Sequence, residues 1–112
     1  MNKLSDEILK KKYEELHNNF IKGDFQKVIK GCNKVLEKRK NQLFFNLLCI
    51  AYQKIGKIEK SIDVMNEALT FNPNHPDFLN NLGLCFYMLH KISEAEKYFK
   101  KGLEIDNKHL HI

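Results

Sequence analysis

The sequence predicts an all-α protein in which short helices stack as antiparallel pairs, and three observations lead to this fold class. The chain has 112 residues, enough for a single domain, residues 1–112, with one modest core. Its apolar residues recur at spacings of three and four, which places them on one face of a helix. When residues 42–75 are aligned with residues 76–109, similar residue types fall at matching positions, so the chain contains an internal repeat.

The first helix pair is expected within residues 8–41. Its first helix should run from about Ser5 to Ile21, because Ser5 suits the N-cap and acidic residues follow in the first turn. Gly23 and Asp24 form the turn to the second helix. The two apolar stripes are Tyr13, Leu16 and Phe20, then Phe25, Val28, Cys32, Val35 and Leu36. Each connection is one residue shorter than in the later copies, so this copy matches the repeat least well.

The second and third pairs occupy residues 42–75 and 76–109, and they match each other closely. Gly56 separates the two stripes of the second pair, which indicates a tight turn. Pro73 cannot extend a helix and Pro76 suits the first turn of the next one, so these prolines mark the boundary between copies. The stripes are Phe45, Leu48 and Tyr52, then Ile58, Ile62, Met65 and Leu69, and in the third pair Leu79, Leu82 and Phe86, then Ile92, Ala95, Phe99 and Leu103. The sequence thus predicts about six helices.

Composition excludes several classes of protein. With 43% hydrophobic residues the chain is too apolar to be disordered, and no apolar stretch approaches the ~18 to 20 residues that cross a bilayer. Residues 1–12 are polar and do not resemble a secretory signal. Cys32, Cys49 and Cys85 form no zinc-binding pattern, and their odd number suits a reducing compartment. We therefore expect a soluble, cytoplasmic protein with no membrane partner.

The net charge of +5 comes from the first third of the chain. Residues 1–41 contain 11 basic and 6 acidic side chains, whereas the remaining residues are balanced. The run of Lys10, Lys11 and Lys12 could attract an acidic partner, although a charge run on a long helix is usually a solvated face. Arg39 is the sole arginine, and bidentate recognition of phosphate or guanine depends on the guanidinium group, so nucleic acid is not expected as a partner.

The repeated residues resemble the tetratricopeptide repeat, a 34-residue helix-turn-helix unit with Leu-Gly, Tyr, Ala, Phe, Ala and Pro at set positions. The resemblance covers about residues 8–109. Its matching positions are Phe45, Leu48, Tyr52, Gly56, Ser61, Met65, Ala68 and Pro73 in the second copy, and Leu79, Leu82, Gly83, Phe86, Ala95, Phe99 and Gly102 in the third. The chain departs from the pattern at four positions: Cys49 for Gly, His90 for the turn Gly, Gly102 for Ala and Asn107 for Pro.

The resemblance implies a right-handed superhelix of three tandem repeats, because a helix pair this short cannot bury its own apolar stripe and each copy must cover the next. Small side chains should let the helices of a pair approach, and they are Ala51, Ser61, Ala68, Gly83, Ala95 and Gly102. Bulky side chains should fill the core: Phe45, Leu48, Tyr52, Ile62, Met65, Leu69, Leu82, Phe86, Phe99 and Leu103. The first helix of each pair is expected to line a concave face.

No catalytic constellation is visible, so an enzyme is not expected. The five histidines are not in register with a cysteine or carboxylate that would complete a triad, and no glycine-rich phosphate loop occurs. His109 and His111 could clip a metal ion, but a pair near a chain end is more often solvated, so no metal or cofactor is expected. The three cysteines fall on packing positions and are expected to be inert core residues.

The resemblance places a peptide-binding groove on the concave face, at positions 2, 5, 9, 12 and 13 of each copy. In the second copy we assign these to Phe44, Asn46, Ile50, Gln53 and Lys54, and in the third to Asp77, Asn80, Leu84, Tyr87 and Met88, with Asn81 beside them. The first copy, with its shifted register, contributes Lys11, Glu14, Asn18 and Lys22. Asn46 and Asn80 should stack, and an amide offers a peptide backbone both a donor and an acceptor. Alternatively both are merely solvated, since the chain contains 12 Asn.

Chaperone-binding members of the family clamp a C-terminal carboxylate with Lys and Arg at two positions of the third copy. The matching positions here are Asp77 and Asn81, so the resemblance disfavours an acidic chaperone tail as the ligand. We therefore expect a protein-interaction scaffold that binds a different extended or helical peptide, or a partner protein, in the groove.

The third copy is followed by no polar capping helix, because Lys108 to Ile112 are too few residues for a further helix. An apolar edge would then be left open, consisting of Phe86, Leu103, Ile105, Leu110 and Ile112. This edge should be buried either in a homodimer or in a longer protein. Two alternative functions follow, a self-assembling structural unit and a substrate-recruiting segment of a larger glycosyltransferase- or sulfotransferase-like protein.

Overall fold

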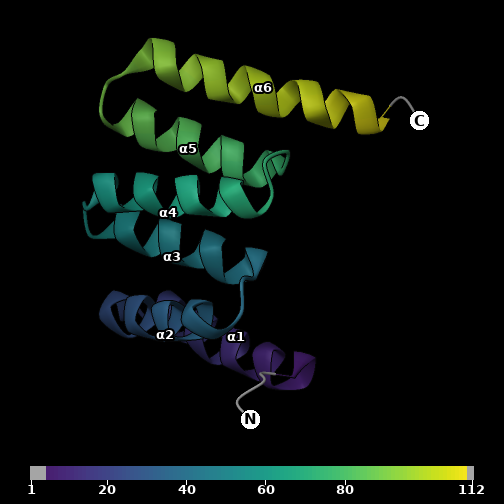
Figure 1. Ribbon diagram of the computed structural model, residues 1–112. Helices are drawn as coiled ribbons and strands as arrows, with labels where there is room; N and C mark the ends of the chain where they lie inside the picture. Colours follow the sequence, from purple (N-terminus) through teal and green to yellow (C-terminus); the bar gives the residue numbers. More distant parts are fainter. Residues whose placement is uncertain (1–4, 111–112) are drawn as a thin grey trace.

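The computed structural model describes residues 5–110, with side chains over residues 5–107, and this part of the chain is all-helical (Figure 1). The helices are α1 (Asp6–Ile21), α2 (Phe25–Lys38), α3 (Gln42–Lys54), α4 (Ile58–Phe71), α5 (Pro76–Met88) and α6 (Ile92–Leu110). The predicted all-α fold class, the six helices and their order are therefore confirmed. Among the described helices, none is long and apolar enough to pass through a membrane.

The helix ends follow from the residues that cap and turn them. The Ser5 hydroxyl accepts a hydrogen bond from the Ile8 amide at 3.2 Å, as an N-cap does. Gly23 and Gly56 turn the chain within the first two pairs with φ of 82° and 78°, a left-handed conformation that glycine adopts without strain. His90 occupies the equivalent turn of the third pair with φ of 63°, so a residue with a side chain is held in a conformation that costs ~1 to 2 kcal/mol.

The helices stack in an order that makes the solenoid curved (Figure 1). Each helix packs on the next, and α3 also touches both α1 and α5. By contrast, no Cα atom of α4 lies within 8 Å of a Cα atom of α2 or α6 over the described residues. Because the odd-numbered helices approach one another and the even-numbered ones do not, the odd-numbered helices line the inner, concave side of the curve.

The core runs through all three pairs and contains most of the predicted residues. All six small residues expected at close helix approaches are buried. Phe45, Leu48, Met65 and Leu82 are each at most 2% exposed. Tyr52, Ile62, Leu69, Phe86 and Phe99 are only partly buried, which fits their places near the edges of the helix pairs.

Leu103 was predicted in the core, and that prediction is wrong. Its side chain is 61% exposed. It lies on α6, the last of the described helices, and within residues 5–110 no further helix covers the outer side of α6. The apolar stripe of the third pair is therefore exposed at Ile92 and Leu103, whereas the stripe of the second pair has no exposed member.

The end of the chain also differs from the prediction. Residues 108–112 were expected to be too few for a helix of their own, and residues 108–110 extend α6 instead, which is 19 residues long and projects beyond the stack (Figure 1). Of the predicted apolar edge, Phe86 and Ile105 are half-buried and Leu103 is exposed. The side chain of Leu110, and Ile112 as a whole, lie outside the described residues.

Candidate functional site

The concave side of α5 carries a continuous exposed stripe. The helix is covered by α3, α4 and α6, so only one of its faces is free. Five side chains are exposed on that face, and all five were predicted there: Asp77, Asn80, Leu84, Tyr87 and Met88. Three of them are large and apolar, with Leu84 39%, Tyr87 57% and Met88 40% exposed.

The concave side of α3 begins one residue earlier than predicted. Phe44 is 1% exposed and packs edge-on against the Tyr13 ring of α1 at 5.7 Å, so it belongs to the core and not to the groove. Leu43 takes its place at 48% exposed. The alignment of the two copies contains the signal that was missed, because Leu43 is the second residue of its copy, as Asp77 is of the next. Of the other predicted residues, Ile50 is half-buried and Lys54 is exposed.

Gln53 was also predicted in the groove and is instead buried. Its amide nitrogen donates to the Cys85 sulfur at 3.2 Å and lies 3.7 Å from the Cys49 sulfur. A buried amide needs such partners, since leaving it unpaired would cost ~1 to 3 kcal/mol. Gln53 therefore ties α3 to α5 and does not face a ligand.

Two asparagines link α3 and α5 at the concave face, but they are not the expected pair. The Asn81 side-chain amide donates to the Asn46 side-chain oxygen at 2.9 Å, in a partly buried position. Asn80 is exposed, and no side-chain hydrogen bond is seen for it within residues 5–107. Asn46 thus serves mainly to join two repeats, whereas the Asn80 amide is free to bind a ligand.

The concave face extends to α1 through a hollow of about 360 Å³ between the first turns of α1 and α3. The residues that line it are Asp6, Leu9, Lys10, Tyr13, Glu14, Asn41, Leu43 and Phe44. At the other end of α1, Ile21 is 69% exposed. The face therefore has apolar side chains from all three odd-numbered helices, with charged groups of both signs near α1.

Models of the tetratricopeptide repeat match residues 42–75 and 76–109, which together make up more than half of the chain. The chain belongs to the tetratricopeptide repeat family. The first helix pair is not matched by these models, but it has the same helix-turn-helix form and stacks on the second pair. The predicted family is therefore confirmed, and the first helix pair stays a predicted third repeat.

Known relatives cover this tetratricopeptide chain well but extend beyond it. Heat shock protein STI1 of Saccharomyces cerevisiae is 28% identical over 89 residues, which make up 78% of this chain. The chain spans 15% of the length of STI1 and 54% of the length of a second curated relative.

Solved structures share the fold at low sequence identity. PcrH of Pseudomonas aeruginosa, in complex with the chaperone binding region of PopB, has a TM-score of 0.83 at 19% identity over 94% of this chain and 86% of PcrH. The second tetratricopeptide domain of Spaghetti (RPAP3), bound to the HSP90 peptide SRMEEVD, has a TM-score of 0.76 at 20% identity over 85% of this chain and 84% of that one.

The three thiols of this tetratricopeptide chain are free and buried, as the sequence predicted. A hydrogen bond with the Cys85 thiol, together with burial, raises the pKa of Cys49. Burial alone raises the pKa of Cys32 to about 12. Both groups are therefore protonated at neutral pH and are poor nucleophiles. Among residues 5–107, no group of three or more His, Cys, Asp or Glu side chains is placed to hold a metal ion, and the His109 and His111 side chains lie outside this range.

The raised pKa of Cys32 predicts that stability falls at high pH. The unfolded thiol loses its proton near pH ~8.5, but the folded one keeps it up to about pH 12. The stabilisation that comes from the raised pKa of Cys32 is therefore complete below the thiol pKa of the unfolded chain. It is lost as pH rises towards the thiol pKa of the folded protein, with a slope of up to ~1.4 kcal/mol per pH unit. Urea unfolding at about pH 8 and about pH 10 should show a steeper loss for the wild type than for Cys32→Ala. Parallel losses in the two proteins would contradict this account.

Proposed function

We propose that this protein is a non-catalytic interaction module that binds a peptide segment of another protein on its concave face. One observation carries the proposal. Nine large apolar side chains are exposed among the described residues, and four of them lie on the concave side of α3 and α5: Leu43, Leu84, Tyr87 and Met88. Exposed apolar side chains that gather on one face are typical of a binding surface. The three free, buried thiols suit a reducing compartment, and we propose the cytoplasm.

The chemistry of the face favours a peptide with apolar side chains. Tyr87 offers a flat apolar ring with a polar hydroxyl group, a combination that often dominates binding energy at interfaces. Asn80 lies one helical turn before Leu84 and two turns before Tyr87. Its side-chain amide offers a donor and an acceptor to a peptide backbone. A ligand could therefore place apolar side chains between the odd-numbered helices while its backbone is held by the Asn80 amide.

Similar structures support a peptide as the ligand, although not the same peptide. RPAP3 is bound to the HSP90 peptide SRMEEVD, and PcrH to a region of PopB. In this chain the concave face near the start of α5 carries Asp77, which is exposed and would repel an acidic tail. We therefore propose that the ligand is an apolar peptide and not an acidic chaperone tail.

The test is to remove the free amide and the most exposed ring of α5 together. Peptides of about 15 residues would first be selected from a random library on the wild-type protein. Their affinity for Asn80→Ala/Tyr87→Ala, measured by fluorescence anisotropy, should fall by at least ~10-fold, because aromatic anchors contribute ~2 kcal/mol or more.

The matched control is Asn66→Ala/Leu103→Ala, which removes an amide and a large apolar side chain from the outer helices α4 and α6. Both residues are exposed, so this variant should fold and should bind the selected peptides as the wild type does. The proposal is wrong if peptides bind both double variants with equal affinity.

A further inference from the structure

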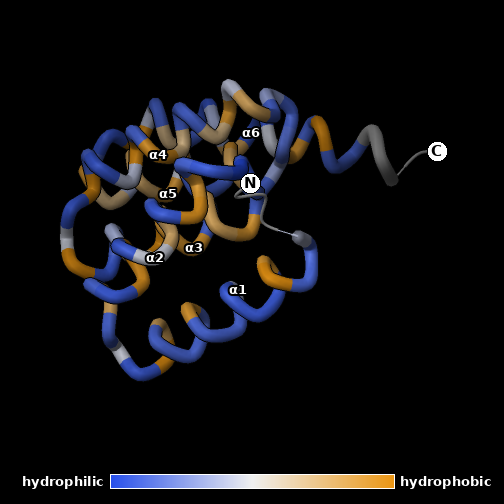
Figure 2. The backbone as a smooth tube through the Cα atoms, turned by 60° about the horizontal axis from the view of Figure 1, so that its bottom comes forward, coloured by the Kyte–Doolittle hydropathy of each residue, from blue (hydrophilic) through white to orange (hydrophobic). Residues whose placement is uncertain are grey.

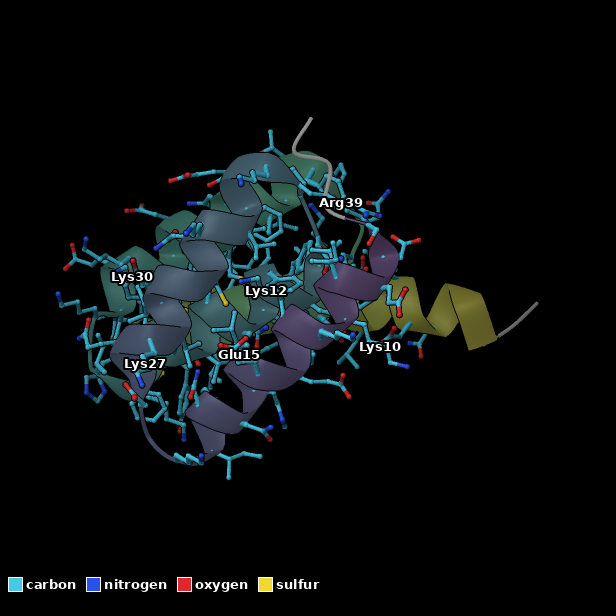
Figure 3. The ribbon with its side chains drawn as sticks, turned by 90° about the horizontal axis from the view of Figure 1, so that it is seen from below. Lys10, Lys12, Glu15, Lys27, Lys30 and Arg39 are labelled. Atoms are coloured by element: carbon cyan, nitrogen blue, oxygen red, sulfur yellow. The ribbon has the colours of Figure 1, made fainter. Side chains whose placement is uncertain are left out.

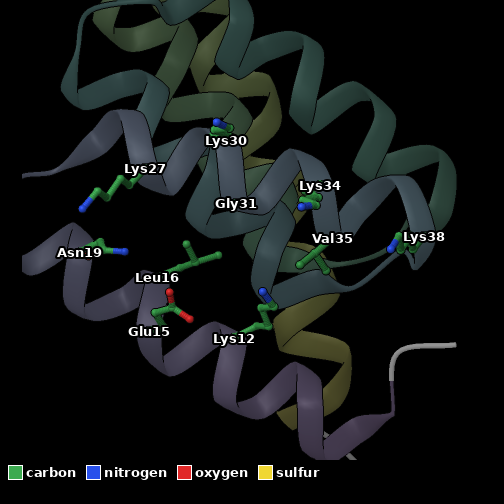
Figure 4. A pocket seen from close by; sticks show the side chains of 10 residues that line it. All are labelled: Lys12, Glu15, Leu16, Asn19, Lys27, Lys30, Gly31, Lys34, Val35 and Lys38. Carbon is green, nitrogen blue, oxygen red and sulfur yellow. The ribbon is translucent and has the colours of Figure 1, made fainter. Parts of the chain in front are cut away.

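A second cleft lies outside the concave face, between α1 and α2 at the first end of the stack. Figure 3 looks onto this end, and Figure 4 shows the cleft from close by. Its volume is about 440 Å³, larger than the hollow between α1 and α3. We call it the α1–α2 cleft, and it is lined by Lys12, Glu15, Leu16, Asn19, Lys27, Lys30, Gly31, Lys34, Val35 and Lys38.

The α1–α2 cleft is strongly basic. Five of its ten lining residues are lysines and one, Glu15, is acidic, so most of the positive charge excess of the chain is gathered around it. Lys27 lies 3.6 Å from the Asp24 carboxylate in an exposed pair. The other four lysines make no ion pair or hydrogen bond within residues 5–107. Their charges are therefore available to an acidic group.

The floor of the cleft is apolar. Leu16 of α1 and Val35 of α2, which are 6% and 4% exposed, line it from opposite sides (Figure 4). A Cβ atom on Gly31 would lie 2.4 Å from a Leu16 methyl group, so the glycine is what lets α2 come this close to that side chain. The cleft thus combines a narrow apolar floor with rims of lysine.

The outer face of α1, beside the cleft, can be compared with the equivalent face of α3 in the second repeat. Lys12, Glu15 and Asn19 of α1 occupy the repeat positions that α3 fills with Phe44, Leu47 and Ala51. Those three residues of α3 are at most 5% exposed, in the helix against which α2 packs. The corresponding face of α1 carries polar residues and has no helix on it among residues 5–110; Figure 2 shows α1 as hydrophilic over most of its length. The outer face of α1 is therefore uncovered beside the α1–α2 cleft, with charged residues on both rims.

The charges on this part of α2 differ from those of the second repeat but not from those of the third, where α6 carries Lys97 and Lys101 at the same repeat positions. Lys30 and Lys34 of α2 occupy the repeat positions that α4 fills with Asp63 and Glu67, so the charges there are reversed. A helix face that only contacts solvent does not require charges of a single sign. A partner that carries negative charge on both sides of an apolar stripe would match this arrangement.

We propose that the α1–α2 cleft binds an amphipathic α-helix of a partner protein, with an apolar stripe that contacts Leu16 and Val35 and with acidic residues flanking that stripe. The helix would pack on α1 as α2 packs on α3, and its side chains would reach those of α2. Its carboxylates would pair with Lys12 on one rim and with Lys30 and Lys34 on the other. This site is distinct from the concave face and does not depend on the function proposed for it.

The test uses a synthetic 18-residue helical peptide with Leu at every third or fourth position and Glu on both flanks of that stripe. Fluorescence anisotropy at about 50 mM salt should show binding to the wild type that weakens as salt is added. The variant Lys30→Glu/Lys34→Glu should bind at least ~10-fold more weakly. A peptide with Lys in place of Glu should show the opposite preference and bind the variant more tightly than the wild type.

The matched control is Lys100→Glu/Lys101→Glu, which makes the same change in net charge at exposed lysines of α6. It should bind the acidic peptide within ~2-fold of the wild type, as should Asn80→Ala/Tyr87→Ala, which separates this site from the concave face. Circular dichroism confirms that each variant is folded. The proposal is overturned if both lysine pairs lower affinity equally. It is also overturned if a scrambled peptide of the same composition, a single-stranded oligonucleotide or an anionic vesicle binds as tightly as the amphipathic peptide and with the same sensitivity to Lys30→Glu/Lys34→Glu.

Discussion

Replacing Phe78 with alanine is expected to lower the free energy of unfolding by ~3 to 5 kcal/mol. The Phe78 ring is fully buried, stacks on the His75 ring at a centroid distance of 4.2 Å and meets the Phe45 ring edge-on at 6.1 Å. It therefore joins the second repeat to the third, and its removal would leave a cavity at the interface between them. A loss of this size is a large share of the ~5 to 15 kcal/mol that stabilises a typical domain.

Urea unfolding followed by circular dichroism would measure the effect of Phe78→Ala. Leu103→Ala is the control, because Leu103 is also a large apolar residue of the third repeat but is 61% exposed. Its loss should change stability by no more than ~0.5 kcal/mol. Similar losses for the two variants would mean that the repeats do not depend on the contact between Phe45 and Phe78.

The same substitution at two buried glycines, Gly83→Ala and Gly102→Ala, is expected to have opposite effects. A Cβ atom on Gly83 would lie 2.7 Å from the Phe99 ring and 3.2 Å from the Ala95 carbonyl oxygen, so α5 and α6 would have to separate. We expect a loss of ~1 to 3 kcal/mol from this overpacking. A Cβ atom on Gly102 would lie no closer than 3.6 Å to its neighbours. Alanine there should stabilise the protein by ~0.5 to 1 kcal/mol through its better helix propensity.

Thermal and urea unfolding of the two variants side by side would test this difference. Both changes add one methyl group within a helix, so differences in composition cannot explain opposite signs. A stabilising Gly83→Ala, or a clear loss of stability in Gly102→Ala, would show that the packing between α5 and α6 is looser than the structure indicates.

The helices and turns could be predicted from the sequence because their signals are local. Ser5 and Gly23 bound the first helix, and the internal repeat transfers the pattern from one copy to the next. The turn at His90 could be placed only through that repeat, since histidine itself gives no turn signal. For Leu103 the sequence supported two incompatible predictions, a place in the core and a place on the open apolar edge, and its 61% exposure agrees with the edge.

The exposure of the candidate site residues was predicted in part. On α5 five of the six predicted residues are exposed and Asn81 is part-buried, whereas on α3 an error of one residue exchanged Leu43 for the buried Phe44. Neighbouring helical positions point about 100° apart, so such a shift moves a side chain from the surface to the core. Gln53 could not be recognised as buried, because its sulfur partner Cys85 lies on a different helix, far along the chain. The α1–α2 cleft required the structure, since its lysines are scattered along two helices.

The touching odd-numbered helices and the separated even-numbered ones also determine how the molecule can deform. The outer helices approach one another only through side chains, as at the Lys40–Glu67 ion pair between the α2–α3 turn and α4, so the outer rim is held less firmly than the inner side. On the inner side, the 2.9 Å hydrogen bond between Asn81 and Asn46 holds α5 to α3. We therefore expect the spacing between neighbouring repeats to change slightly with the length of the bound segment.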